Sequence, residues 1–398
     1  MMRVTIFTNN FLPRVSGVSV AVNFLRTALH LRGHEAMIVA PDYGPGSGEV
    51  DDNIYRVTSI KILTNKFSVP IRFLDYGLVE DELENFQPLL IHVHHPFLLG
   101  KMGLDMAETF KIPIVYTFHT LYDFFMHYFL LDTPGMRQAT TDYVVRFANL
   151  CDLVIAPTEP IKEYLQKIGV KTWVESVPTG IDFSRFENMT PERLDAQIKK
   201  RGLDRFDELM LYVGRIAKEK NVETLFESLR ILLARGRNIA LVIAGEGPEH
   251  RTLEKLATKM KIADHVIWTG FLSQTELPEL YFIARVFVFP SPSDTQGIVL
   301  YEALMAGTPI VALESMASRA ALRHGENGLF ADNRPDDFAD KIAEVLDDPD
   351  RFNARFDSYP FSYEAIGKKY ENLYQRLVER GRKPITDKSL LRGLILKE

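Results

Sequence analysis

Short apolar runs alternate with segments of helical periodicity from one end of this 398-residue chain to the other. The runs are rich in β-branched residues and too continuous for strands with one exposed face, so they predict strands covered on both faces. Between the first two runs, Val18–Leu31 has apolar residues at helical spacing, and Gly33 follows as a stop. This βαβα order predicts an α/β fold with a parallel sheet. The runs in the first half are Val4–Phe7, Ala36–Ala40, Leu89–Val93, Ile112–Phe118 and Leu153–Ala156.

The alternation pauses over residues 180–207, which are polar and charged and predict a linker with a surface helix. We therefore expect two doubly wound, Rossmann-like domains, residues 1–180 and 181–362. A helix over Tyr363–Val378 opens a closing segment, residues 363–398, which crosses back. Because open α/β sheets bind ligands beyond the carboxyl ends of their strands, we expect a ligand cleft between the domains. The runs of the second series are Leu209–Val213, Ile239–Ala244, His265–Phe271, Val286–Phe289 and Pro309–Leu313.

Composition excludes several classes of protein. Lys+Arg 47 against Asp+Glu 53 gives a net charge of -6, which argues against a nucleic-acid binder. The single cysteine, Cys151, excludes an internal disulfide framework and a multi-cysteine metal site, and its apolar surroundings predict a buried side chain. The N-terminus lacks the pattern of a signal peptide, and no apolar run approaches the ~18 residues that span a bilayer. We expect a cytoplasmic protein, peripheral on a membrane at most.

Polar residues follow the predicted strands of the first domain. Gly17 opens a helix, where a glycine serves either as a turn or as a place for an anionic ligand to approach backbone N–H groups. His92 and His94 share one side of a strand, as cleft-facing or structural residues; without a third ligand they are not a zinc signature. His119 ends the next strand, where it can hydrogen-bond a reacting hydroxyl or phosphate.

An aromatic cluster follows His119 and includes Phe124 and Phe125. Such a cluster either belongs to the core or lines an apolar acceptor site.

The second domain opens with a strand followed by Gly214, Arg215 and Lys220. A planar guanidinium, a point charge and a helix N-terminus together suit phosphate groups, although a surface salt-bridge cluster has the same composition. A second glycine-containing loop, Gly245-Glu246-Gly247-Pro248, follows the next strand. It is no dinucleotide fingerprint, because the third glycine is missing, and the chain has no Walker A sequence.

Two acids, Asp294 and Glu302, flank a glycine-containing loop and a helix start. Carboxylates bind sugar hydroxyls through paired acceptors, but acids spaced along a helix are usually solvated. Here the helix is otherwise apolar, so we expect Glu302 to be partly buried and to have a partner. The loop residues between the acids are Thr295, Gln296 and Gly297.

Taken in order over roughly residues 1–375, these motifs resemble the retaining glycosyltransferases of the GT-B fold, in particular glycosyltransferase family 4. The resemblance implies that Arg215 and Lys220 bind the diphosphate of a nucleotide-sugar, with Gly17 and Gly214 giving it room. It implies that Glu302 holds the ribose and Asp294 the hexose, beside His119. Further donor contacts are implied for Glu246, Phe271, Thr295, Gln296 and Gly297, with the base near Gly270–Phe271.

One residue departs from the family pattern. The family's first acid is usually Glu, and Asp294 is one methylene shorter, which retracts the carboxylate by roughly 1.5 Å. We therefore expect an altered position or preference for the donor hexose. No metal or other cofactor is expected for the chemistry, and the triplet Asp348-Pro349-Asp350 is interpreted as a helix cap.

Within the family, Phe7–Val18, His119–Tyr128 and Ser293–Gly297 resemble bacterial diacylglycerol glycosyltransferases. The stretch Asn53–Leu74 is basic, apolar and free of acids, which suits an anionic lipid surface, each cation contributing about 1 kcal/mol. The basic tail Arg380–Lys397 suits an interfacial helix. A charged edge strand and a disordered tail are the alternative. The basic residues of this stretch are Arg56, Lys61, Lys66 and Arg72, and the expected acceptor or membrane residues are Arg14, Lys61, Lys66, Arg72, Phe124 and Phe125.

The resemblance thus implies a transferase that moves glucose or galactose from a UDP-sugar to 1,2-diacylglycerol at the inner face of the cell membrane. The same chemistry fits phosphatidylinositol, a soluble sugar or a polysaccharide as acceptor. A nucleotide-sugar-binding protein without turnover and a nucleotide-sugar epimerase on the same fold are alternatives from other classes.

Overall fold

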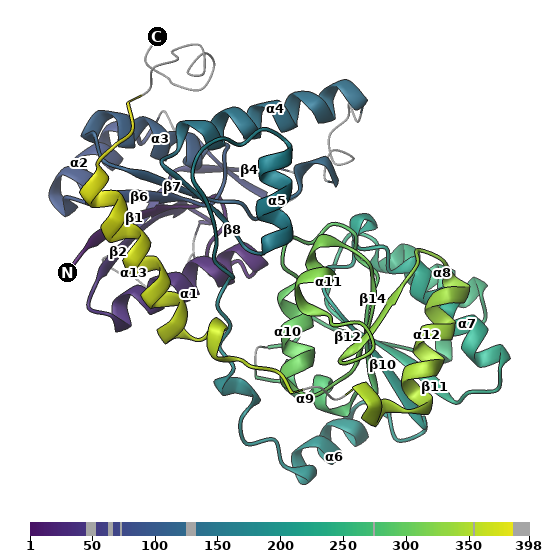
Figure 1. Ribbon diagram of the computed structural model, residues 1–398. Coiled ribbons are helices and arrows are strands. Elements are labelled where there is room, and N and C mark those ends of the chain that lie inside the picture. Colours follow the sequence, from purple (N-terminus) through teal and green to yellow (C-terminus); the bar gives the residue numbers. More distant parts are fainter. Residues whose placement is uncertain are drawn as a thin grey trace. The chain divides into compact units, whose positions relative to one another are not determined.

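A computed structural model describes the protein over residues 1–44, 53–62, 67–71, 74–124, 133–273, 275–352 and 355–384. The chain forms two compact units (Figure 1). Unit 1 consists of Met1–Ile181 together with the chain after Ser358, and unit 2 is Asp182–Ser358. The sequence predicts a first domain that ends at residue 180 and a separate closing segment over residues 363–398. In the structure the final helix is part of unit 1.

Unit 1 is built on a parallel sheet of order β3-β2-β1-β6-β7-β8-β9. Parallel strands need coverage on both faces, which explains why most of these strands are continuous apolar runs. A separate antiparallel pair, β4 and β5, lies outside this sheet. The strands are β1 (Arg3–Phe7), β2 (Glu35–Pro41), β3 (Ile54–Val57), β4 (Ser59–Ile62), β5 (Phe67–Pro70), β6 (Leu90–Val93), β7 (Ile114–Thr117), β8 (Leu153–Ala156) and β9 (Val174–Ser176).

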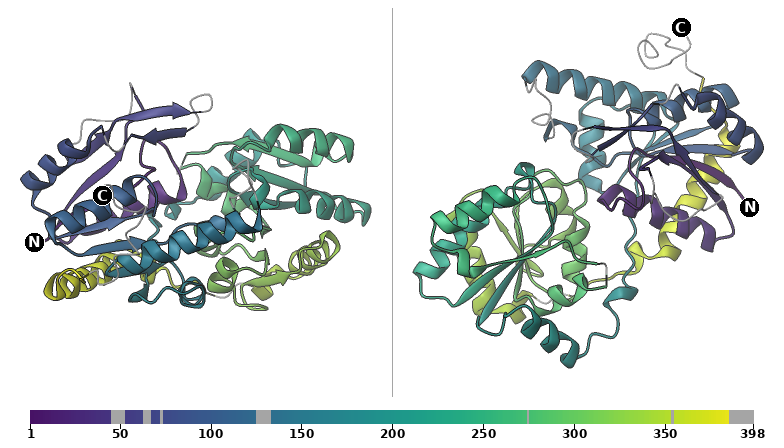
Figure 2. Two further views of the ribbon diagram at one scale, coloured as in Figure 1. Left: turned by 90° about the horizontal axis from the view of Figure 1, so that it is seen from above. Right: turned by 180° about the vertical axis from the view of Figure 1, so that it is seen from behind.

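The first and last helices, α1 (Gly17–Leu31) and α13 (Tyr363–Arg380), pack against each other and on the same face of this sheet (Figures 1 and 2). Phe24 stacks on Tyr363 with ring centroids 4.0 Å apart, and Arg32 Nε donates to Glu371 Oε2 over 2.6 Å. These contacts fix the return of the chain to unit 1. The remaining helices are α2 (Tyr76–Phe86), α3 (Leu99–Phe110), α4 (Pro134–Leu150) and α5 (Glu159–Lys167).

Unit 2 contains a second parallel sheet, of order β12-β11-β10-β13-β14-β15. Its central strands are adjacent although they are far apart in the sequence, so the loops after them meet at one edge of the sheet. The strands are β10 (Glu208–Val213), β11 (Ile239–Ala244), β12 (Val266–Gly270), β13 (Val286–Phe289), β14 (Ile310–Leu313) and β15 (Gly328–Ala331).

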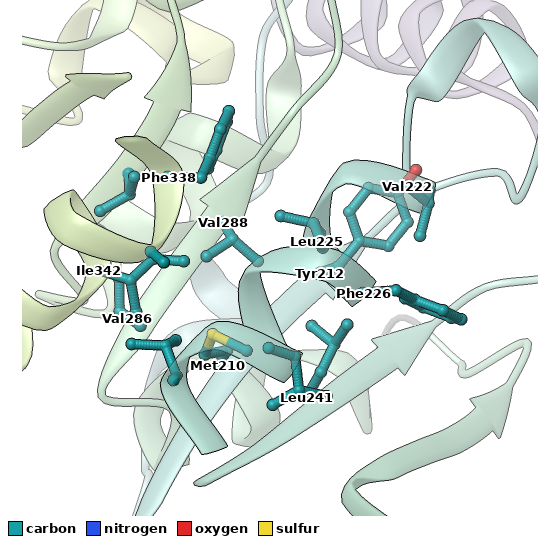
Figure 3. Packing of buried hydrophobic residues seen from close by; sticks show 14 of the residues in the cluster. Met210, Tyr212, Val222, Leu225, Phe226, Leu241, Val286, Val288, Phe338 and Ile342 are labelled. Atoms are coloured by element: carbon teal, nitrogen blue, oxygen red, sulfur yellow. The ribbon is translucent and has the colours of Figure 1, made fainter. Parts of the chain in front are cut away.

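The core of unit 2 lies between this sheet and the helices α7 (Glu223–Ala234) and α12 (Pro335–Asp347) (Figure 3). Met210 and Leu241 from the sheet meet Leu225 of α7 and Ile342 of α12, and each of these side chains is fully buried. Burial of such side chains fixes the sheet edge that carries the loops. The other helices are α6 (Pro191–Lys200), α8 (His250–Lys259), α9 (Leu277–Ile283), α10 (Ile298–Met305) and α11 (Met316–Ala321).

The predicted fold class, two doubly wound α/β domains, is confirmed. The strands β3, β4, β5, β9 and β15 lie outside the runs that the sequence singled out. In the part of the chain that the structure describes, no helix is both long enough and apolar enough to cross a bilayer. The segment 385–398, which holds most of the predicted interfacial tail, lies outside the described residues.

Candidate functional site

Three loops of unit 2 are joined by backbone hydrogen bonds where β10, β11 and β12 end. Gly214 N donates to Ala244 O over 3.0 Å, Gly245 N to Gly270 O over 2.9 Å, and Ile216 N to Glu246 O over 3.0 Å. The residues that the sequence selected after these strands therefore share one edge of the sheet. An ideal Cβ on Gly245 would lie 2.0 Å from Gly214 O, so close packing of the loops is enough to require glycine there.

The two cations after β10 take different positions. Lys220 Nζ donates to Asp294 Oδ1 over 2.7 Å, and the two side chains are 16% and 25% exposed. Arg215 is more open, 44% exposed, and lies 3.8 Å from Glu219 Oε1. Glu219 is itself buried, and its carbonyl oxygen accepts from Ser293 Oγ over 3.1 Å. The turn of Lys218–Lys220 and the loop after β13 are thus held together by charge and by hydrogen bonds.

The loop before α10 is polar in sequence yet largely buried. Thr295 and Gln296 are 9% and 4% exposed, and Ser293 is 3% exposed. Gly297 caps α10 with φ of 65°, a left-handed conformation that favours glycine. The loop therefore has a fixed backbone at the start of the helix that carries Glu302.

Glu302 is buried and has two partners, as expected for an acid on an apolar helix. Its Oε1 forms an ion pair with Arg185 Nη2, and its Oε2 accepts from the Tyr281 hydroxyl over 2.6 Å. Burial, followed by the nearby Glu302 charge, raises the pKa of Tyr281 well above its usual value, so the phenol stays a donor. Neither Arg185 nor Tyr281 was among the predicted site residues. The only sequence signal for these two partners was the expectation that Glu302 is buried and therefore paired.

The remaining predicted donor residues lie near the end of β12. Phe271 follows this strand and is 64% exposed. Glu246 is also exposed and receives a hydrogen bond or ion pair from His250 Nδ1 at 3.0 Å. The ring of His250 stacks on Trp268 with centroids 4.5 Å apart. This part of unit 2 therefore offers an open aromatic side chain beside an oriented carboxylate.

In unit 1, three of the predicted histidines form a chain of contacts at the ends of β6 and β7. His92 bonds through Nδ1 to the Tyr374 hydroxyl and through Nε2 to Thr117 Oγ1, each over 2.7 Å. His94 Nδ1 lies 2.7 Å from His119 Nε2. His94 and His119 also line a small hollow within unit 1, together with Thr117 and Tyr370.

Burial keeps these imidazoles neutral. It lowers the pKa of His92 and of His119 to about 3, with smaller contributions from the neighbouring histidines, and lowers that of His94 well below its usual value. The pKa of His95 falls to about 4 for the same reason. At neutral pH, His119 is therefore a neutral hydrogen-bonding group. Among the described residues, no group of three His, Cys, Asp or Glu side chains could hold a metal ion.

Gly17 is the first residue of α1, after the N-cap Ser16, whose side chain accepts from Ser19 N. A Cβ on Gly17 would meet nothing within 4 Å, so packing within unit 1 does not require glycine. Arg14, half-buried in the loop before α1, donates its backbone N–H to Phe11 O over 3.1 Å.

The predicted acceptor and membrane residues are only partly described. Phe124 is 40% exposed, whereas Lys66, Arg72 and Phe125 lie outside the described residues, as does the side chain of Lys61. Arg56 does not belong to an open basic surface. Its guanidinium donates to Leu12 O over 2.7 Å and lies over the Phe11 and Tyr43 rings, so these contacts hold this arginine within unit 1.

Comparison with known proteins covers both units. Residues 15–185 match the family described as Glycosyltransferase Family 4, and residues 195–360 match Glycosyl transferases group 1. An α-monoglucosyldiacylglycerol synthase of Streptococcus pneumoniae is 30% identical over 94% of this chain and 85% of its own length. A GDP-mannose-dependent α-(1-6)-phosphatidylinositol monomannoside mannosyltransferase of Mycobacterium tuberculosis is 34% identical over 88% of this chain and 91% of its own.

Among solved structures, sucrose-phosphate synthase from Thermosynechococcus elongatus is similar with a TM-score of 0.78 and 20% identity, covering 96% of this chain and 100% of its own. That likeness shows the fold. Together with the two family matches and the relatives, it shows that the chain is a glycosyltransferase of the GT-B fold and belongs to glycosyltransferase family 4.

Proposed function

We propose that the protein transfers glucose or galactose from a UDP-sugar to 1,2-diacylglycerol, with retention of the anomeric configuration, and makes a membrane glycolipid. The observation that carries the proposal is the Lys220–Asp294 ion pair in the loops of unit 2, in a chain related over 94% of its length to an α-monoglucosyldiacylglycerol synthase.

The donor half of the proposal rests on the cations of unit 2. An ammonium group has three donors. In the described part of the chain Lys220 uses one of them on Asp294, which leaves two for diphosphate oxygens. Arg215, which is 44% exposed, adds a planar guanidinium, the form of cation that fits phosphate best. In this proposal Glu302 accepts hydrogen bonds from the ribose, Asp294 contacts the hexose, and Thr295, Gln296 and the N-terminal end of α10 lie along the sugar diphosphate.

The remaining donor residues have subsidiary roles in the proposal. Gly17 leaves room for the diphosphate, because no described atom of unit 1 lies within 4 Å of the Cβ position there. Gly214 shapes the loop after β10, and Glu246 and Phe271 flank the base.

The proposed chemical step needs no covalent intermediate. The bond between the anomeric carbon and the β-phosphate oxygen breaks, and the acceptor hydroxyl oxygen bonds to the same carbon from the same face. The hydroxyl proton passes to the leaving phosphate oxygen, so UDP departs with the proton. Arg215 and Lys220 stabilise the charge that develops on the diphosphate. His119, kept neutral by burial, orients a hydroxyl of the sugar or acceptor through a hydrogen bond.

The acceptor half rests on the name of the streptococcal relative and on exposed apolar side chains of unit 1. Ile60 on β4 is 55% exposed, and Leu74 and Leu78 are each 56% exposed. Phe124 adds an exposed aromatic ring. The stretch Asn53–Leu74 also contains Lys61, Lys66 and Arg72 in its sequence. Basic and exposed apolar residues together suit the anionic cytoplasmic surface of a membrane. We therefore propose a peripheral enzyme that meets its lipid acceptor there.

A second candidate is mannosyl transfer from GDP-mannose to a phosphatidylinositol mannoside. The mycobacterial relative, at 34% identity, is what favours it. Both candidates use the same phosphate-binding residues and differ in the base, the hexose and the lipid.

The test is radiolabelled transfer from a panel of UDP- and GDP-hexoses, with diacylglycerol or phosphatidylinositol mannoside in anionic mixed micelles. Labelled glucosyl- or galactosyl-diacylglycerol from one UDP donor supports the proposal. Label from GDP-mannose in the phosphatidylinositol lipid supports the second candidate. Donor consumption without a labelled glycolipid would contradict the proposed lipid acceptor. If no donor is consumed, the proposal that the protein is a catalytically active transferase is contradicted.

A further inference from the structure

The Glu302 carboxylate is a buried charge with a partner on each oxygen. The residue is 4% exposed on α10, where its neighbours are apolar. Arg185 Nη2 pairs with Oε1, and the Tyr281 hydroxyl donates to Oε2. An unpaired carboxylate at this depth would be strongly unfavourable, so these partners explain how α10 carries an acid here.

Arg185 is held firmly in place. It belongs to the short 3₁₀ turn Ser184–Phe186, just after the chain enters unit 2, and its side chain is 13% exposed. Its Nε donates to Asp182 O over 3.1 Å, and its guanidinium carbon lies 5.4 Å from the Phe186 ring centroid. The Phe186 ring in turn lies 6.0 Å from the Tyr281 ring. The two partners of Glu302 therefore belong to one packed cluster.

The Glu302 carboxylate can accept more hydrogen bonds than its two protein partners supply. An ionised carboxylate has about four lone-pair sites, two on each oxygen. Among the described residues, Arg185 and Tyr281 take one on each oxygen, so one remains on each. Two adjacent acceptor sites match the two hydroxyls of a ribose cis-diol.

We infer that Arg185 is a positioning residue for the nucleotide ribose: it holds Glu302 in the orientation that accepts the ribose hydroxyls. This inference rests on the proposed function, which makes Glu302 the ribose ligand. A mobile arginine that merely occupied the carboxylate until a ligand displaced it would behave in the opposite way, because its removal would strengthen nucleotide binding. The fixed contacts of Arg185 favour the positioning role.

The test is calorimetric binding of UDP and of 2′-deoxy-UDP to the wild type and to Arg185→Met. We expect the wild type to bind UDP about tenfold more tightly than 2′-deoxy-UDP, the effect of one hydrogen bond to a charged group. Arg185→Met should weaken UDP binding about tenfold and 2′-deoxy-UDP binding by less, because 2′-deoxy-UDP keeps only the contact of its 3′-hydroxyl with Glu302, so that the ratio falls toward one. Arg185→Lys, which keeps a point charge, should give an intermediate ratio. GDP and 2′-deoxy-GDP repeat the comparison for the other base.

Arg193→Met is the matched control. Arg193 pairs with Glu279, another buried acid of unit 2, whose side chain is 5% exposed, and it does not contact Glu302. Loss of that pair should lower the unfolding temperature and leave the UDP to 2′-deoxy-UDP ratio at the wild-type value. A ratio that changed equally in both variants would mean that Arg185 acts through stability alone, and would overturn the inference.

The other outcomes separate the inference from the proposed function. Tighter UDP binding by Arg185→Met, or a wild-type ratio in Arg185→Met and Arg185→Lys, overturns the positioning role while nucleotide binding stands. Equal binding of UDP and 2′-deoxy-UDP by the wild type overturns the ribose assignment of Glu302. A wild type that binds neither UDP nor GDP overturns the proposed function and the inference with it.

Discussion

Lys220 Nζ donates to Asp294 Oδ1 over 2.7 Å, joining the turn after β10 to the loop after β13 across 74 positions of the sequence. Both side chains are partly open, so the pair is neither a surface salt bridge nor a sealed core pair. The acid orients the ammonium group, and the ammonium group fixes the acid. Each residue thus fixes the orientation in which the other can contact a ligand. The roles of the ammonium group and of the carboxylate can be tested separately.

Lys220→Met should lower kcat/KM by about 10²–10³-fold, because it removes a fixed positive charge from the leaving diphosphate. The free energy of unfolding should fall by about 1–3 kcal/mol, between the values for an exposed and a buried pair, since both side chains are only partly open. Steady-state transfer assays and thermal unfolding measure the two effects. Lys200→Met is the control, because Lys200 pairs with Glu276 on the surface of the same unit, and its activity should equal the wild type. Wild-type turnover in Lys220→Met would contradict the phosphate role.

Asp294→Glu should change the preference between UDP-glucose and UDP-galactose by about tenfold or more, which corresponds to roughly 1.4 kcal/mol in relative transition-state binding. The added methylene moves the carboxylate by roughly 1.5 Å toward the hexose. The flexible Lys220 stem can follow the acid, so the ion pair should persist. The measurement is the ratio of kcat/KM for the two donors in the variant and in the wild type. An unchanged ratio would show that the shorter acid does not set the donor preference.

The buried strands could be predicted closely from the sequence. The runs Leu153–Ala156, Ile239–Ala244 and Val286–Phe289 coincide with β8, β11 and β13, because strands covered on both faces leave continuous apolar runs. β3 lies at the edge of its sheet and is half-buried, and β15 begins with a glycine, so neither leaves such a run.

The site could be predicted only in part. Residues that follow strands were found because parallel strands bring their carboxyl ends to one edge. Arg185 was not, since its partner Glu302 is 117 positions away and no local pattern joins them. Arg56 shows the reverse difficulty. A basic residue in an apolar stretch suggests a lipid surface, but the Arg56 guanidinium contacts two backbone carbonyls and two aromatic rings.

Gly17→Ala should stabilise unit 1 slightly, by up to about 1 kcal/mol, because alanine is the better helix former and no described atom of unit 1 lies within 4 Å of the new Cβ. Donor KM should nevertheless rise, since the methyl group projects where the diphosphate is proposed to approach. Gly77→Ala, a second open glycine in a helix of unit 1, is the matched control for stability and should leave KM unchanged. If Gly17→Ala kept the wild-type KM, the glycine would be a helix start and nothing more.

Acid should unfold unit 1 before unit 2. The folded-state pKa values of His92, His95 and His119 are about 3, 4 and 3, below the usual 6.5, and that of His94 is also well below it. The unfolded chain therefore binds more protons than the folded chain below pH 6.5. The free energy of unfolding has its full value above that pH and falls as the pH drops toward 4, by up to about 1.4 kcal/mol per pH unit for each histidine.

The two tryptophans allow each unit to be followed separately, since Trp173 lies in unit 1 and Trp268 in unit 2. Trp268→Phe leaves Trp173 to report unit 1, and Trp173→Phe leaves Trp268 to report unit 2. Urea midpoints from tryptophan fluorescence at pH 7.5 and 5.5 stay above the range where most carboxylates titrate. The midpoint of unit 1 should fall by more than that of unit 2, because the four imidazoles whose pKa values burial lowers all belong to unit 1. Equal shifts in the two variants would contradict the neutral histidine cluster at the ends of β6 and β7.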